Sequence, residues 1–198
     1  PSPAANAAVP WAASGPLTAR PGRSLLPVLP REQPSSREYL YTEYHTHSPT
    51  NYYPQRTVRD DRFKLIQNLL PGEENPGYEF TLKRFFPGLP STIAAASPHV
   101  QAAYALSKQP PEFELYDLQN DPFEFRNLSG QAGHADKLAE LKRELAAWRK
   151  ETADPLLDRN NVARLKQELE ACITSDGQGH KDRLQLTYPE YFFGHEGK

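Results

Sequence analysis

The sixteen residues from Phe113 to Leu128, FELYDLQNDPFEFRNL, determine how we interpret the rest of the chain. Apolar Phe113 and Leu115 alternate with more polar neighbours, which is typical of a β-strand with two different faces. Pro122 has no N–H group to donate to a neighbouring strand, so the strand must end before it. Asp121 can accept a hydrogen bond from the backbone that follows and set a turn. We therefore predict a strand, a turn and a glycine-containing loop that leads into a helix.

The predicted helix covers about residues 134–152 and shows the clearest periodicity in the chain. Its apolar residues recur every three or four positions and form one stripe, while charged residues occupy the remaining faces. Asp154-Pro155 is expected to end the helix. The stripe consists of Leu138, Leu141, Leu145 and Trp148.

A second, shorter helix is predicted at about residues 161–172, with Asn160 or Asn161 as its N-cap. Its apolar positions repeat the same spacing and end at Cys172, which is most simply a small buried residue. The other members of this stripe are Val162, Leu165 and Leu169.

Three further strands are predicted upstream, at Arg37–His47, Gln55–Arg59 and Phe63–Leu69. The sequence pattern is weakest in residues 77–109. A short helix is expected near residues 97–107, and residues 78–86 are expected to form either a helical turn or an irregular segment. Four antiparallel strands followed by a long helix that covers one sheet face define an α+β fold.

The bulk composition limits the possible functions. A formal net charge of -2 argues against a dedicated nucleic-acid-binding protein, and no apolar run is long enough to span a bilayer. The single cysteine, Cys172, excludes an internal disulfide and a zinc site made of cysteines alone. The chain contains no methionine and opens at Pro1 with a Pro/Ala-rich segment, so we expect a processed or truncated piece.

Three blocks of sequence, in this order, resemble the type I sulfatase family. The most specific is the E-L-Y-D-L-x-x-D-P-x-E-x-x-N-L pattern, which is similar to the closing segment of these enzymes. The resemblance covers roughly residues 16–157, and the heparan N-sulfatase branch matches best. The blocks are residues 22–29, residues 53–59 with 63–69, and residues 114–128.

This resemblance implies a domain plan. Residues 1–36 would be the end of a catalytic domain and a linker, 37–157 the sulfatase C-terminal domain, and 158–198 a C-terminal helix and extension. The fold would be the C-terminal subdomain of an alkaline-phosphatase-like sulfatase, in which a small antiparallel sheet packs against a C-terminal helix. The implied partners are the missing catalytic domain and a sulfated sugar. A periplasmic, extracellular or lysosomal location is expected from the same resemblance.

Catalysis in this family uses a formylglycine, made from a cysteine or serine in a motif with proline and arginine, and a calcium ion. Cys172 lies in A-C-I-T-S-D, which lacks both the proline and the arginine. The Asp60-Asp61 pair falls in a predicted hairpin turn and not after an N-terminal strand. We therefore expect no catalytic residue, metal ligand or cofactor in this chain. Calcium and formylglycine would belong to the full-length parent.

His45 and His47 are the first candidates for a substrate-binding site. They stand two positions apart on a predicted strand, which would place both rings on one side. Such a pair can meet an anionic sugar or hold a metal ion, although a metal site needs a third ligand and the other histidines are scattered. The alternative is a pair of exposed or hydrogen-bonded strand histidines. By its resemblance to the family, His47 matches a histidine at the rim of the active-site cleft, whereas His45 has no counterpart.

Arg56 is the third candidate, because a guanidinium offers a fork of donors suited to a carboxylate or a sulfate. Its alternative role is a structural ion pair that holds the hairpin to the catalytic domain. Asp117, Asp121 and Glu124 are expected to be structural, through turn formation and a pair with Arg126.

The favoured function is therefore the C-terminal part of a sulfatase that hydrolyses sulfate esters or N-sulfates of glycosaminoglycan-type sugars. This chain would supply packing and part of the substrate rim and would be inactive alone. One alternative is a stand-alone module that binds carbohydrate or protein without catalysis. Another is a purely structural fragment left by a frameshift or a misassigned start.

Overall fold

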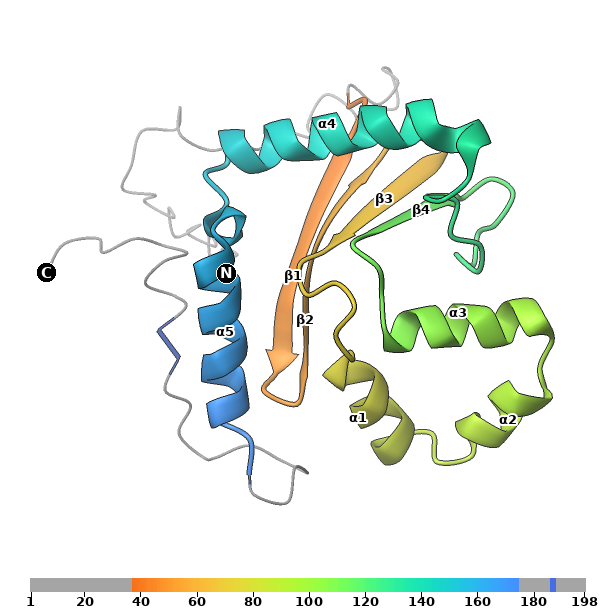
Figure 1. Ribbon diagram of the computed structural model, residues 1–198, viewed down its shortest axis with the longest axis vertical. Helices are drawn as coiled ribbons and strands as arrows, with labels where there is room; N and C mark the ends of the chain where they lie inside the picture. The colour runs from red at the N-terminus through yellow and green to blue at the C-terminus, as the bar shows by residue number, and fades with distance from the viewer. Residues whose placement is uncertain (1–36, 175–185, 188–198) are drawn as a thin grey trace, which may run out of the picture. The chain divides into compact units, whose positions relative to one another are not determined.

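The structure is a computed structural model that describes residues 37–174, 186 and 187. The domain prediction for residues 1–36, and most of that for the extension, concerns residues outside this part. Figure 1 shows the arrangement of the elements. In chain order they are β1 (Leu40–Ser48), β2 (Asn51–Arg59), β3 (Phe63–Asn68), α1 (Pro76–Arg84), α2 (Leu89–Ala95), α3 (Pro98–Lys108), β4 (Phe113–Asp117), the 3-10 helix η3 (Ala132–His134), α4 (Ala135–Glu151), the 3-10 helix η4 (Pro155–Leu157) and α5 (Arg159–Ala171).

The four strands form one antiparallel sheet in the order β1-β2-β3-β4. Each strand pairs with the next one along the chain, so the sheet has no crossover. Strand β2 begins at Asn51, four residues before the predicted start, because the turn after β1 takes only Pro49 and Thr50. The sheet and the helices together confirm the predicted α+β class.

The segment that follows β4 folds back along the outer edge of that strand. The side-chain oxygen of Asn127 accepts from the backbone N–H of Leu115, and the N–H of Leu128 donates to the carbonyl of Leu115. Asp121 sets the reversal, since its carboxylate accepts from the N–H of Arg126, as the sequence predicted. The returning segment thereby satisfies backbone groups that an edge strand would otherwise leave unpaired.

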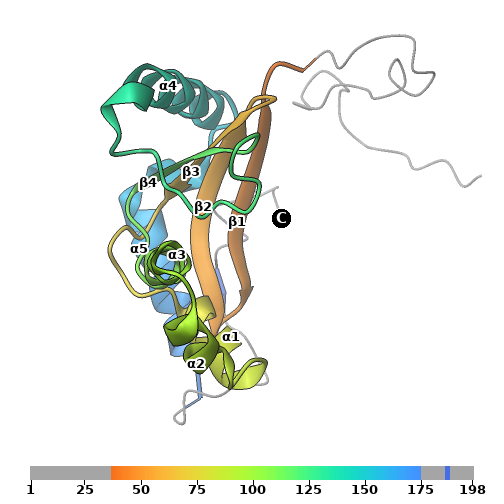
Figure 2. The same cartoon turned by 90° about the vertical axis from the view of Figure 1, so that its right-hand side faces the viewer.

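Helix α4 packs across one face of the sheet, near the end where β1 begins (Figure 2). Its predicted stripe faces the strands: Leu141 and Leu145 are fully buried, and Trp148 stacks on Tyr41 with ring centroids 5.1 Å apart. Burying a leucine side chain contributes roughly 1.5–3 kcal/mol, so this stripe is a main reason why the helix stays on the sheet. The strand residues beneath it are Val58, Leu65 and Leu115.

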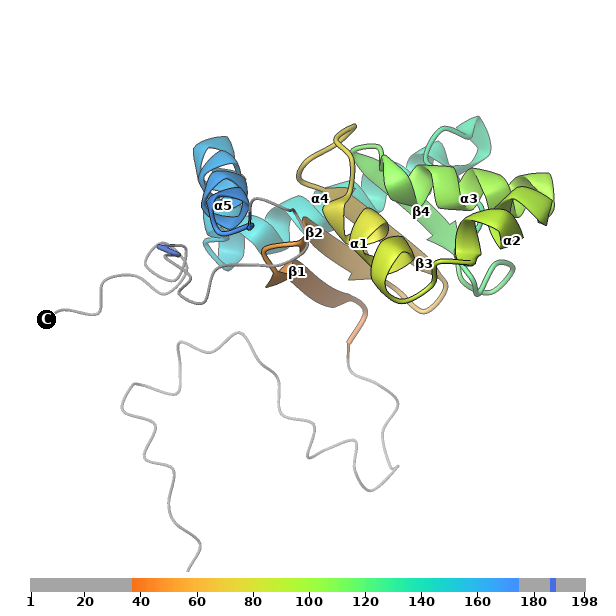
Figure 3. The same ribbon diagram turned by 90° about the horizontal axis from the view of Figure 1, so that it is seen from below.

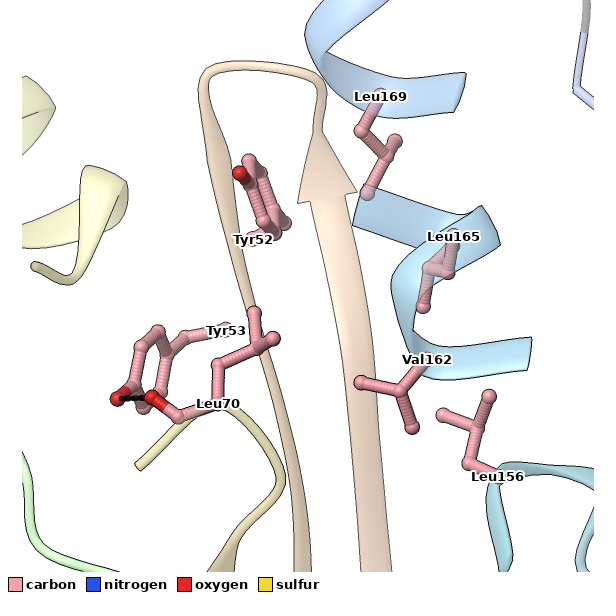
Figure 4. Close-up of a cluster of buried hydrophobic side chains, with 7 residues drawn as sticks. All are labelled: Tyr52, Tyr53, Leu70, Leu156, Val162, Leu165 and Leu169. Atoms are coloured by element: carbon pink, nitrogen blue, oxygen red, sulfur yellow. Dashed lines mark hydrogen bonds between the residues drawn. The ribbon is translucent and has the colours of Figure 1, made fainter. Parts of the chain in front are cut away.

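Helix α5 packs beside the β1–β2 hairpin and builds the second apolar cluster (Figure 4). The predicted stripe is buried again, with Cys172 at its end. On the strand side, the hydroxyl of Tyr53 donates to the carbonyl of Leu70 at 2.5 Å, as the dashed line in Figure 4 shows. Tyr52, Tyr53, Leu70, Leu156, Val162, Leu165 and Leu169 form the cluster.

The predicted N-cap of α5 is wrong. Asp158 caps the helix, because its carboxylate accepts from the N–H of Asn160 at 2.8 Å. The side chain of Asn161 donates to the carbonyl of Pro155 and so anchors the preceding turn. Aspartate and asparagine are equally good caps, and the sequence offered several of them in a row.

Helices α1, α2 and α3 form an excursion between β3 and β4. The helical turn left open for residues 78–86 is part of α1, and the short helix expected near residues 97–107 is α3. Figure 1 and Figure 3 show the excursion and α5 on opposite sides of the hairpin end of the sheet. Asn75 starts α1 by accepting from the N–H of Gly77, and its backbone N–H donates to the carbonyl of Lys108 at the end of α3.

Candidate functional site

The three predicted site residues all lie on the β1–β2 hairpin. The pairing runs from Leu40 with Arg59 to Tyr44 with Gln55 without interruption, but the register shifts twice beyond that point. The shifts fall between Tyr44 and Thr46 and between Thr46 and Ser48. Regular alternation therefore does not continue through the two histidines, and their environments differ.

Arg56 is completely buried and points toward the connection between α4 and α5. Its Nε and Nη2 donate to the two carboxylate oxygens of Asp154 at 2.9 and 2.7 Å, and its Nη1 donates to the carbonyl of Gln55. This is a structural ion pair, the alternative that the sequence left open, and the partner belongs to this chain. A substrate group could contact Arg56 only by displacing one of these partners.

Asp154 also binds a second guanidinium. Arg149 donates from Nε to the carboxylate at 2.6 Å, and from its two other nitrogens to the side chain of Gln67 and the carbonyl of Leu156. Burial raises the pKa of Asp154, but the hydrogen bonds and charges of Arg56 and Arg149 outweigh it and lower the pKa below its usual value. The cluster ties β2, β3 and α4 together through one ionised carboxylate.

Neither Arg149 nor Asp154 was predicted to have this role. A weak signal existed for Arg149, which stands four positions after Leu145 and therefore continues the apolar stripe of α4. An arginine at a stripe position indicates a buried charge that needs a partner. Asp154 was noticed only as part of the dipeptide that ends the helix.

His45 lies half-buried beside this cluster. Its Nε2 is 3.8 Å from a carboxylate oxygen of Glu43, and Glu43 in turn lies 3.7 Å from Nε of Arg56. Burial lowers the pKa of His45 to about 4, and the positive charge of Arg56 acts in the same direction. The imidazole is therefore neutral at pH 7 and belongs to the surroundings of the buried arginine.

His47 differs from the other two because its side chain is exposed at the end of β1. The backbone of His47 forms a hydrogen bond with the hydroxyl of Tyr44. That hydroxyl also donates to the backbone carbonyl of Asn51 across the hairpin at 3.1 Å. The position of His47 is therefore fixed by the hairpin, while its ring remains accessible.

The acidic residues around residue 120 are structural, although their partners differ from the expected one. Asp117 pairs with Arg62 at 2.6 Å, and Glu124 pairs with Lys64 at 2.8 Å. Of the group, Asp121 alone binds Arg126, through the backbone N–H. A further acid, Glu114, is buried and accepts from the side chain of Asn68.

Two hollows lie near the hairpin. One, of about 580 Å³, lies between α5 and the segment after β3 and carries both signs of charge, including Glu73, Arg159 and Lys166. The other, of about 450 Å³, lies between the hairpin, α1 and α3. His45, His47 and Arg56 are not among the residues that line either hollow.

A metal site would need a cluster of at least three histidine, cysteine, aspartate or glutamate side chains. The described part of the chain contains no such cluster. The calcium ion and the formylglycine that the resemblance implies for the parent therefore remain predictions about that protein. In the same part of the chain, no helix is both long and apolar enough to cross a membrane.

Comparison of the sequence with known proteins relates the chain to the sulfatases. No family model matches the chain. The human N-sulphoglucosamine sulphohydrolase is 33% identical over 143 residues, which are 68% of this chain and 27% of that protein. An ulvan-active sulfatase from Formosa agariphila is 28% identical over 137 residues, 68% of this chain and 25% of the relative. A solved 2-O GAG sulfatase shares 23% identity and a TM-score of 0.43 over 74% of this chain and 22% of its own.

The chain is a homologue of the sulfatases over about two-thirds of its length. The resemblance to the sulfatases that was inferred from three sequence blocks is confirmed, and the relatives include both an N-sulphoglucosamine sulphohydrolase and an ulvan-active sulfatase. The chain spans about a quarter of the length of the curated relatives it matches.

Proposed function

We propose that this chain is the C-terminal part of a sulfatase that hydrolyses sulfate esters or N-sulfates of glycosaminoglycan-type sugars. The observation that carries the proposal is the 33% identity to an N-sulphoglucosamine sulphohydrolase over 68% of the chain. The nucleophile and the calcium ion would be supplied by the part of the parent that corresponds to the rest of the relatives. A periplasmic, extracellular or lysosomal location would follow from the same proposal.

Within that enzyme, the chain would supply packing and one part of the substrate rim. His47 is the residue best suited to the rim, because its ring is exposed and its backbone is held by the hairpin. An imidazole at this position can donate to a sugar hydroxyl or to a sulfate oxygen. Arg56 and His45 would act behind it, since Arg56 is committed to Asp154 and His45 is half-buried next to Arg56.

The test is His47→Ala in the full-length enzyme, with kcat/KM measured on a sulfated sugar and on a small aryl sulfate. An aryl sulfate lacks the sugar hydroxyls, so the variant should lose about tenfold on the sugar, the equivalent of roughly 1.4 kcal/mol, and less than twofold on the aryl sulfate. His99→Ala, which removes an exposed histidine on α3, is the matched control and should leave both values unchanged. Equal losses on both substrates would show that His47 is merely structural.

The coding sequence upstream of residue 1 provides an independent test. A formylglycine motif with cysteine or serine followed by proline and arginine, preceded by an Asp-Asp pair, is the expected result. A stop codon and a start directly upstream would instead favour a stand-alone binding module.

A further inference from the structure

The hollow between the β1–β2 hairpin, α1 and α3 has the dimensions and the lining of a small-ligand pocket. Its volume of about 450 Å³ falls within the range of roughly 300–1,000 Å³ that is usual for such pockets. Tyrosine rings and side-chain amides dominate its walls, together with leucines from α1 and α2. The polar members used below are Tyr44, Asn51, Gln55, Asn75, Tyr78 and Tyr104.

Two of these polar groups are available to a ligand. Tyr53, at the back of the hollow, donates its hydroxyl to a carbonyl, and the amide nitrogen of Gln55 donates to Asn68. By contrast, the hydroxyls of Tyr78 and Tyr104 make no hydrogen bond with the side chains and backbone groups that the structure describes in residues 37–82 and 85–174. Burial and the charge of Glu79 raise the pKa of Tyr78, Lys108 acts in the opposite direction, and the neighbouring Tyr104 adds a smaller upward contribution. The two hydroxyls can each donate one hydrogen bond and accept others.

The charge of the lining defines the ligand further. None of the described side chains that line the hollow is formally charged. The nearby cation Lys108, which acts on Tyr78, is already paired with Glu74 and Glu79. A sulfate placed among the uncharged lining residues would therefore lose water without gaining a free cation, which is unfavourable. Tyrosine rings present apolar faces with a polar tip, and amides offer both donors and acceptors. This combination suits a ring that has C–H groups on its faces and hydroxyls on its edge.

We propose that this hollow is a binding site for an uncharged sugar ring. It adjoins the proposed substrate rim, because Tyr44 lines the hollow and its hydroxyl is hydrogen-bonded by the backbone of His47. The assignment as a subsite for the unsulfated neighbour of the sugar that carries the sulfate rests on the proposed function. Binding of the neutral ring itself depends only on the residues of the hollow.

A glycine pair in this region allows a sharp test. Gly77 is buried at the start of α1, and a methyl group there would collide with the side-chain oxygen Oδ1 of Asn51. Gly77→Ala should therefore displace the amide of Asn51 from the wall of the hollow, while alanine itself is well tolerated in a helix. Gly88→Ala is the matched control, since a methyl group at Gly88 meets nothing within 4 Å.

The experiment is a titration of the full chain with methyl β-D-glucopyranoside, followed by ligand-observed and tyrosine-ring NMR signals. Glucose 6-sulfate serves as the charged counterpart of the same ring. We expect saturable binding by the unmodified chain and by Gly88→Ala, and at least fivefold weaker binding by Gly77→Ala. A second variant, Tyr78→Phe with Tyr104→Phe, keeps both rings in place and should weaken binding to a similar extent. Circular dichroism confirms that each variant is folded.

Three results would overturn the proposal. The first is the absence of saturable binding to the neutral glucoside. The second is equal binding by Gly77→Ala and Gly88→Ala, together with unchanged binding by the double phenylalanine variant. The third is a clear preference for glucose 6-sulfate. The His47 experiment on the full-length enzyme uses a different residue and a kinetic readout. A negative result for the sugar-ring site would therefore leave the proposed function intact. A negative result for His47 would likewise leave the binding of a neutral sugar ring in the hollow intact.

Discussion

Replacing Asp154 with asparagine should destabilise the protein more than the removal of a charge from any partly exposed ion pair of the fold. Asp154 binds Arg56 through two hydrogen bonds and Arg149 through a third, and all three residues are buried. Asparagine has nearly the same shape and keeps an oxygen that can accept from the N–H of Leu156, as the carboxylate does now. The substitution therefore removes the charge and replaces one acceptor oxygen, the one that binds Nε of Arg56 and of Arg149, with an NH2 group that can only donate.

The expected loss is about 3–5 kcal/mol, because breaking a buried ion pair leaves an uncompensated charge in the interior. Here two guanidiniums lose their shared counter-ion, and the nearest remaining carboxylate, Glu43, is half-exposed at 3.7 Å from Arg56. A domain of this size has a free energy of unfolding of about 5–15 kcal/mol, so the variant would lose a large share of it.

Urea denaturation of both proteins at pH 7 measures the effect. With a slope of about 2 kcal/mol per molar urea, the midpoint should fall by about 2 M while the slope stays unchanged. Glu124→Gln is the control: it removes a carboxylate from the partly exposed pair with Lys64 and should cost less than about 1 kcal/mol. If Asp154→Asn costs no more than Glu124→Gln, the buried cluster does not stabilise the fold as argued.

The remaining predictions concern a titrating side chain and a packed one. The pKa of His45 lies at about 4, below its ordinary 6.5, so the unfolded state takes up a proton first as the pH falls. Stability should therefore be highest above pH 6.5 and fall by at most about 3 kcal/mol by pH 4, and His45→Gln should remove that part of the pH dependence in urea titrations. Leu156→Ala should lower the free energy of unfolding by about 2–5 kcal/mol, because this side chain is 2% exposed. Leu157→Ala should lower it by less than about 0.5 kcal/mol, because Leu157 is 49% exposed. Equal midpoints for the two leucine variants would contradict the packing described around α5.

Local patterns in the sequence predicted the elements whose faces are chemically distinct. The stripes of α4 and α5 and the alternation in β4 appear directly in the spacing of apolar residues, and the structure buries most of those residues and partly buries Phe113, Leu138 and Trp148. The excursion was harder because the residues of α2 and α3 form no fully buried stripe, so their pattern is weak.

The buried charge cluster could not be found in this way. Arg56 and Asp154 are 98 positions apart, and no periodicity connects them. Whether a strand arginine meets a ligand or a carboxylate depends on which side chain the α4–α5 connection places beside it. The register shifts near Thr46 were equally invisible, because they arise from the pairing between two strands and not from either strand alone.

The excursion that carries α1, α2 and α3 is inserted between two neighbouring strands of the sheet, which bears on how its sequence can vary. Residues 69–112 leave the sheet after β3 and return to β4, its direct neighbour, so the strand order does not depend on what lies between them. Loop closure becomes only slowly more costly with length, by about 0.6 kcal/mol for each doubling. The helices α1 to α3 of the excursion, beyond Leu70 in the α5 cluster, can therefore vary between related chains or be replaced by design. Such a change would alter the proposed sugar-facing wall while the sheet that positions His47 stays constant.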